Sequence, residues 1–229
     1  MADVPSTGTQ LSTLVRLTLK RMMRGRAVWV CLIIALSPVL LGIALRTNSK
    51  ASEIITGIEI LVMAVVSPVL VSSSIGDEIE DRTVTYLWSR PLPRWTMIVG
   101  KLLALAPITM VIIIIGWNIA MLLGTQALAP PRTTAGFAIG ALAVSTMTVG
   151  VATLVPRFGI ALSIGYILVL DFGIGLMPAA LREISVTYQV SRLLGVDENA
   201  AVAQPAITIM VIAGIWLAIG LWRIRKLEA

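Results

Sequence analysis

Long apolar runs separated by short polar stretches dominate the chain. The longest runs each hold about 20 residues, and a helix rising about 1.5 Å per residue then crosses the roughly 30 Å hydrocarbon layer of a membrane. The predicted spans cover about 27–45, 54–75, 102–123, 135–156, 158–177 and 205–222. Only Pro156, Arg157 and Phe158 separate the fourth span from the fifth, and the combined apolar stretch is too long for one straight crossing. The pattern predicts an all-α membrane protein with six transmembrane helices, forming a single domain over 1–229.

Residues 10–25 precede the first span and repeat their apolar positions with a helical period. One face carries Leu11, Leu14, Val15, Leu19 and Met22. The opposite face carries Arg16, Lys20 and Arg24. This pattern predicts an N-terminal amphipathic helix lying in the membrane interface. The alternative is a basic flank that only sets the topology.

Composition supports the membrane class and removes several kinds of chemistry. Hydrophobic residues make up 57% of the chain and charged residues 13%, whereas soluble domains carry about 25% charged residues. There is no histidine, and the one cysteine, Cys31, lies in an apolar run, so we expect no disulfide within the chain and no metal site. The phosphate-binding pattern G-x-x-x-x-G-K-[ST] is missing, because Leu102 follows Gly100-Lys101. We therefore expect a protein that is not an enzyme, binds no cofactor itself and hydrolyses no ATP by itself.

Lysine and arginine are distributed unevenly between the two sides that six spans define, and the richer side is cytoplasmic. With the N-terminus inside, that side holds 13 of the 18 bases, namely Arg16, Lys20, Arg21, Arg24, Arg26, Arg82, Arg90, Arg94, Lys101, Arg157, Arg223, Arg225 and Lys226. The other side holds Arg46, Lys50, Arg132, Arg182 and Arg192. The distribution predicts that both termini and the loop 76–101 are cytoplasmic. It also explains the net charge of +6 without nucleic acid as a partner.

Three polar residues fall inside predicted spans, at a similar depth in the outer half of the bilayer: Glu59, Asn118 and Asp171. Ionisable groups at membrane depth are costly and are candidates for function. One hypothesis is that the three converge on a substrate path or gate. The alternative is that each one snorkels or caps a neighbouring helix. No intramembrane lysine or arginine is available, so a partner subunit or protonation would have to neutralise the two acids if they are buried.

The predicted outer loop, 178–204, fits two kinds of structure. Leu181, Ile184 and Tyr188 have helical spacing, whereas Ile184, Val186, Tyr188 and Val190 alternate as in a strand. We favour short helices lying on the outer surface.

The cytoplasmic loop 76–101 concentrates charge, with acids first and bases later, which suits the dipole of a helix. Pro91 and Pro93 interrupt it and predict a helix, a turn and a second helix. The loop is either a solvated hairpin or a docking element for a cytoplasmic partner.

Motifs in this loop resemble the signature of ABC-2 type transporter permeases. They are Glu78-x-Glu80-x-x-Thr83, Ser89-Arg90-Pro91, Pro91-x-x-Arg94 and Gly100-Lys101. Arg82 stands where many members of that family have glycine. Six spans, cytoplasmic termini, an N-terminal interfacial helix and an outer helical loop before the last span are also similar to that family.

The resemblance implies a permease subunit of an exporter in the cytoplasmic membrane of a prokaryote. It implies a homodimer or heterodimer of permeases above two separate ABC ATPase subunits, which would bind ATP and Mg. The loop would then be a coupling hairpin that docks on the ATPase. The residues expected at that contact are Glu78, Glu80, Arg82, Thr83, Tyr86, Leu87, Trp88, Arg90, Pro91 and Arg94.

Three other functions fit parts of the sequence. An ion-coupled secondary carrier would use Glu59 and Asp171. A membrane-embedded enzyme would need a clustered nucleophile or metal set, which is hard to assemble without histidine. A scaffold that does not transport would use the loop only to recruit a partner. The sequence leaves the transported substrate open.

Overall fold

The computed structural model describes residues 7–80, 95–178, 180–195 and 202–226. Within these ranges the regular elements are all helices, so the predicted all-α class is confirmed. Up to Leu154, the helices are α1 (Thr7–Arg24), α2 (Arg26–Ala35), α3 (Ser37–Ala44), α4 (Ala51–Glu80), α6 (Trp95–Thr125) and α7 (Pro131–Leu154). From Pro156 onward, the helices are η1 (Pro156–Phe158), α8 (Gly159–Gly165), η2 (Tyr166–Asp171), α9 (Phe172–Gly175), η3 (Ala180–Ile184), α10 (Val186–Leu193) and α11 (Ala203–Lys226).

Five helical stretches are long and apolar enough to cross a membrane, so the chain has the character of a multi-pass membrane protein. They are Arg26–Ala44, Ala51–Ser74, Trp95–Thr125, Pro131–Leu154 and Ala203–Ile224. The stretch predicted as the fifth span, 158–177, contains the shorter apolar helix Gly159–Gly175 instead. That helix changes from α8 through the π-helix η2 to α9.

The first span is two helices, because Pro38 interrupts it. Proline has no N–H to donate to the carbonyl four residues earlier. The hydroxyl of Ser37 donates to the Ile34 carbonyl at 2.7 Å, and the Val39 N–H donates to the Leu36 carbonyl at 3.1 Å. Helix α2 therefore ends at Ala35, and α3 begins at Ser37 and continues to Ala44.

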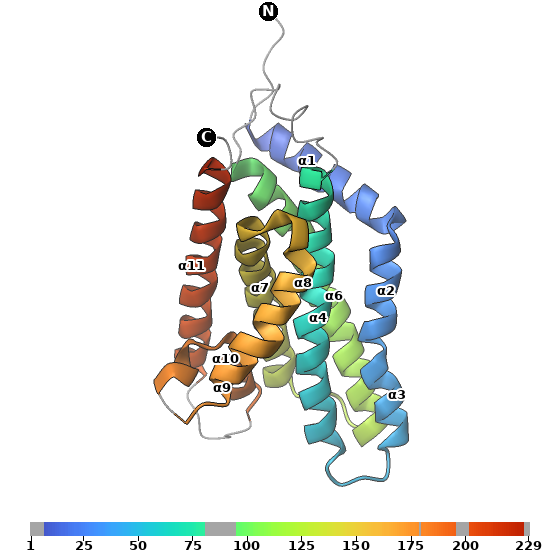
Figure 1. The fold of residues 1–229 in the computed structure, drawn as a ribbon. Helices are drawn as coiled ribbons and strands as arrows, with labels where there is room; N and C mark the ends of the chain where they lie inside the picture. The colour runs from blue at the N-terminus through green and yellow to red at the C-terminus, as the bar shows by residue number, and fades with distance from the viewer. Residues whose placement is uncertain (1–6, 81–94, 179, 196–201, 227–229) are drawn as a thin grey trace, which may run out of the picture.

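Figure 1 shows α1 lying across one end of an upright helix bundle. The C-terminal end of α11 lies at this same end, which we call the α1 end, and the α3–α4 connection and α10 lie toward the opposite end. Helix α7 is central, since it contacts α4, α6, α8, α10 and α11. Its span is 72% buried, whereas the spans formed by α2–α3 and by α11 are each 22% buried. The outer helices thus expose apolar faces, as lipid contact requires.

The apolar face of α1 packs on the bundle. Val15, Leu19 and Met22 join a cluster of apolar side chains from α4, α6, α7 and α11 at the α1 end. Leu17 and Met23 remain exposed. The helix predicted over 10–25 is thus present and begins earlier, at Thr7. Much of the apolar face of α1 that the sequence predicts to contact lipid is therefore covered by other helices of the bundle.

The segment between α9 and α11 is helical where the structure describes it, in η3 and α10. The strand alternative is wrong for residues 180–184 and 186–193, because both stretches are helical. Ile184 is exposed, whereas one face of α10 packs inward. Val186, Val190 and Leu193 are buried on that face. Helix α10 packs against α7 and α11.

Candidate functional site

The predicted coupling hairpin lies mostly outside the described residues. Arg82, Thr83, Tyr86, Leu87, Trp88, Arg90, Pro91 and Arg94 all lie outside them. Glu78 and Glu80 lie in the last turns of α4, of which the structure describes the backbone. Helix α4 thus continues past its apolar span, which ends at Ser74. The hairpin motifs are joined directly to two long helices, α4 and α6.

The Gly100-Lys101 pair, which follows the hairpin, forms a junction of three helices at the α1 end. The Lys101 side chain is buried, and its ammonium donates a hydrogen bond to the carbonyl of Ser74 in α4. A Cβ at Gly100 would lie 3.5 Å from Cβ of Leu14 and 3.6 Å from Cδ1 of Leu11, so α1 packs closely here. The sequence placed Lys101 on the cytoplasmic side and in the Gly100-Lys101 motif, but indicated no contact for its side chain. The structure shows that it ties α6 to α4.

Glu59, in the first third of α4, is a polar group of the described bundle that has no partner for either oxygen. Its side chain is fully buried, and neither carboxylate oxygen has a hydrogen-bond partner. It faces α6 near Gly116, where a Cβ would lie 3.7 Å from Oε1 of Glu59. The same Cβ position is 2.7 Å from the carbonyl oxygen of Ala35. Glu59 therefore lies near the α2–α3 break, at the contact of α4 with α6.

Asp171 has a different environment, at the end of the π-helix. Its Oδ1 accepts from the Val186 N–H at 2.9 Å, and its Oδ2 accepts from the Thr187 N–H at 2.9 Å. The Thr187 hydroxyl donates to Oδ2 at 2.8 Å, and the Ser185 hydroxyl donates to it at 3.3 Å. These donors form the N-terminus of α10, whose partial positive charge favours an anion. Asp171 therefore has hydrogen-bond donors for both carboxylate oxygens within the chain itself.

The side chain of Asn118 forms its hydrogen bond within its own helix, α6. Its amide donates to the Ile114 carbonyl at 2.8 Å, and its side chain is half-buried. No hydrogen bond joins Glu59, Asn118 and Asp171 to one another in the described structure. Each of them instead makes its own local arrangement. Although the sequence predicts a similar membrane depth for the three residues, they do not form one polar cluster.

Among the residues that the structure describes, no three histidine, cysteine, aspartate or glutamate side chains gather as a metal site would require. The chain matches no protein-family model and none of the curated proteins with which it was compared. The buried carboxyl of Glu59 and the Lys101 junction are the two features that a function has to explain.

Sequence reasoning missed the groups around both features. Pro38 was the signal for a helix break, and that break places the end of α2 beside Gly116. The carbonyl that Lys101 contacts belongs to Ser74, which is far away in sequence. Backbone groups carry no residue-specific signal, so only the packing of α4 against α6 reveals this partner.

Proposed function

We propose that this chain is the membrane subunit of an ABC-2 type transporter. It would form the translocation path with six crossings, counting Gly159–Gly175, as half of a permease dimer. The termini and the α1 end would face the cytoplasm, in the inner membrane of a prokaryote. Separate ATPase subunits that bind ATP and Mg would dock on the cytoplasmic side and drive export.

The observation that carries this proposal is the junction at the base of the hairpin. Lys101 joins α6 to Ser74 of α4, and α1 packs on Gly100. A partner that moves residues 81–94 would therefore move α4, α6 and α1 as a connected group. Helices α4 and α6 both contact the central helix α7, so such a movement would reach the middle of the bundle. This is what a coupling element must do.

Reversing the charge of Arg94 tests the docking role. We expect Arg94→Glu to lower co-purification of the chain with a P-loop ATPase by at least about tenfold, because arginines at the centre of a contact often carry 2 kcal/mol or more. The affinity-tagged chain would be purified in mild detergent from cells that encode it. Mass spectrometry would quantify the ATPase, and ATP hydrolysis by the complex would be measured.

Lys50→Glu is the matched control, since Lys50 is exposed between α3 and α4, toward the opposite end of the bundle. It reverses the same charge and should leave co-purification unchanged. Equal recovery of the ATPase with Arg94→Glu and with Lys50→Glu would contradict docking through the hairpin. Absence of any P-loop ATPase from the wild-type preparation would contradict the proposed transporter class.

A second candidate function is an ion-coupled carrier, which the unpartnered carboxyl of Glu59 favours. A carboxylate without a partner in the bundle is an available ligand for a cation. Asp171 no longer supports this candidate, because α10 already satisfies its carboxylate.

Glu59→Gln separates the two candidate functions without requiring a known substrate. For the ABC-2 type subunit, we expect this variant to melt at or slightly above the temperature of the wild-type protein, because it removes an ionisable group that has no partner. We also expect sodium, potassium and choline chlorides to affect both proteins equally. A melting temperature that sodium or potassium raises in the wild-type protein alone would favour the carrier.

A further inference from the structure

A cavity of about 310 Å³ lies at the elbow where α1 turns into α2, next to α4. Residues Arg21, Gly25, Arg26, Leu70, Ser73 and Ser74 are among those that line it, and we call it the elbow cavity. Ligand pockets generally measure about 300–1,000 Å³. The elbow cavity is therefore suited to a small group, such as the headgroup of a lipid, and not to a bulky solute.

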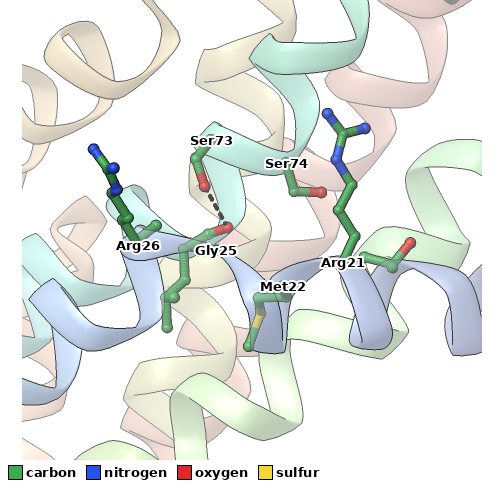
Figure 2. Close-up of a pocket in the computed structure, with 9 residues that line it drawn as sticks. Arg21, Met22, Gly25, Arg26, Ser73 and Ser74 are labelled. Atoms are coloured by element: carbon green, nitrogen blue, oxygen red, sulfur yellow. Dashed lines mark hydrogen bonds between the residues drawn. The ribbon is translucent and has the colours of Figure 1, made fainter.

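Gly25 creates the elbow. Its backbone is extended, with φ −77° and ψ 147°, and its N–H donates to the Met22 carbonyl at 2.8 Å. Helix α1 ends before it, and α2 starts directly after it in a new direction. Figure 2 shows the result, in which Arg21 and Arg26 extend toward the same side and flank Ser73 and Ser74.

The lining combines charged groups that suit an oxyanion with apolar groups that suit hydrocarbon. Arg21 and Arg26 supply two positive charges to the part of the lining that the structure describes. Guanidinium groups match the paired oxygens of phosphate in geometry as well as in charge. Met22 and Leu70 supply the apolar side.

The cavity also lies at the level of a membrane surface. The first candidate span begins at Arg26, and the span of α4 ends at Ser74. Both residues line the cavity, which therefore lies where two spans meet the headgroup region. A phospholipid presents its phosphate at that level and its acyl chains beside the exposed apolar faces of α2.

We propose that the elbow cavity binds the phosphate of one anionic phospholipid from the leaflet that α1 contacts. The lipid would fasten the α1–α2 elbow to α4, through Arg21 and Arg26 of the elbow and Ser73 and Ser74 of α4. This inference does not depend on the proposed transport function. The competing explanation is that the two arginines only extend into the general headgroup layer, without a defined site.

Native mass spectrometry of the intact purified protein tests the proposal, with phosphatidylglycerol as the probe and phosphatidylcholine for comparison. We expect one saturable phosphatidylglycerol on the wild-type protein. Arg21→Gln with Arg26→Gln should weaken it by roughly tenfold or more, since a lost charge-assisted hydrogen bond costs about that factor. The matched control is Arg16→Gln with Arg24→Gln, which removes two exposed charges of α1 that do not line the cavity.

Three results would overturn the proposal. Equal weakening by both double variants would show diffuse attraction to the basic helix. Displacement of the lipid by inorganic phosphate at the same concentration would assign the cavity to a free anion.

A photoactivatable phosphatidylglycerol gives a third measurement on the wild-type protein, which does not depend on the folding of any variant. Its crosslinks should map to the α1–α2 elbow, and labelling that avoids the elbow contradicts the site.

Discussion

Replacing Gly42 with valine is expected to lower the melting temperature of the detergent-purified protein by roughly 2–12 °C. A Cβ at this position would lie 2.5 Å from the carbonyl oxygen of Ala120 in α6. That atom belongs to the backbone of a helix, so it cannot move aside as the end of a flexible side chain could. Overpacking of this kind costs about 1–3 kcal/mol, and each kcal/mol shifts the melting temperature by about 2–4 °C for a chain of this size.

The close approach of α3 and α6 is the reason for this large effect. Gly124 of α6 takes part in it, because a Cβ there would lie 3.3 Å from Cα of Gly42. About two helical turns toward α2, Gly116 allows the same approach to the Ala35 carbonyl. Separating α3 from α6 would therefore also open the contact that covers Glu59. Small residues at such contacts let helices pack when lipid supplies no hydrophobic drive.

Gly214→Val is the matched control, since nothing lies within 4 Å of a Cβ at that position of α11. Both variants place the same β-branched side chain in a helix, so their intrinsic helix propensities change equally. Thermal melting followed by size-exclusion chromatography would compare them. If the two variants melt together, α3 and α6 do not approach as closely as the structure shows.

The second large effect is expected for Asp171→Ala, which removes the acceptor for the N-terminus of α10. The N–H groups of Val186 and Thr187 would lose their partner in a buried position. A buried donor left unsatisfied costs about 1–3 kcal/mol, so we expect a loss of about 2–4 kcal/mol. Thermal melting, together with limited proteolysis at 178–195, would measure the loss and locate it.

Asp171→Asn provides the internal comparison, because it keeps one oxygen acceptor and loses the charge. Its melting temperature should fall between those of Asp171→Ala and the wild-type protein. A structural role predicts that stability and any loss of transport change together along this series. Wild-type stability for Asp171→Ala, combined with lost transport, would instead support the original hypothesis of a substrate path.

Glu59 and Asp171 illustrate how far polar residues in apolar runs can be interpreted from sequence. Each is a single acid inside a predicted span, with no intramembrane base to pair with. The structure gives Asp171 two backbone N–H donors and two hydroxyl donors from residues 185–187. It gives Glu59 no hydrogen-bond partner. Nothing local to either residue distinguishes these outcomes, because the donors come from another segment.

Sequence by itself determined the helical membrane class and the approximate position of the long spans, because apolar length and helical period are properties of neighbouring residues. It also predicted the helix near 10–25, although α1 packs more of its apolar face on protein than the pattern indicated. Only the tertiary structure decided the contact of the α2 end with Gly116, the contact of Lys101 with Ser74 and the cavity at the elbow. Each of these depends on backbone atoms that meet when distant helices pack. Packing of that kind leaves no periodic mark along the chain.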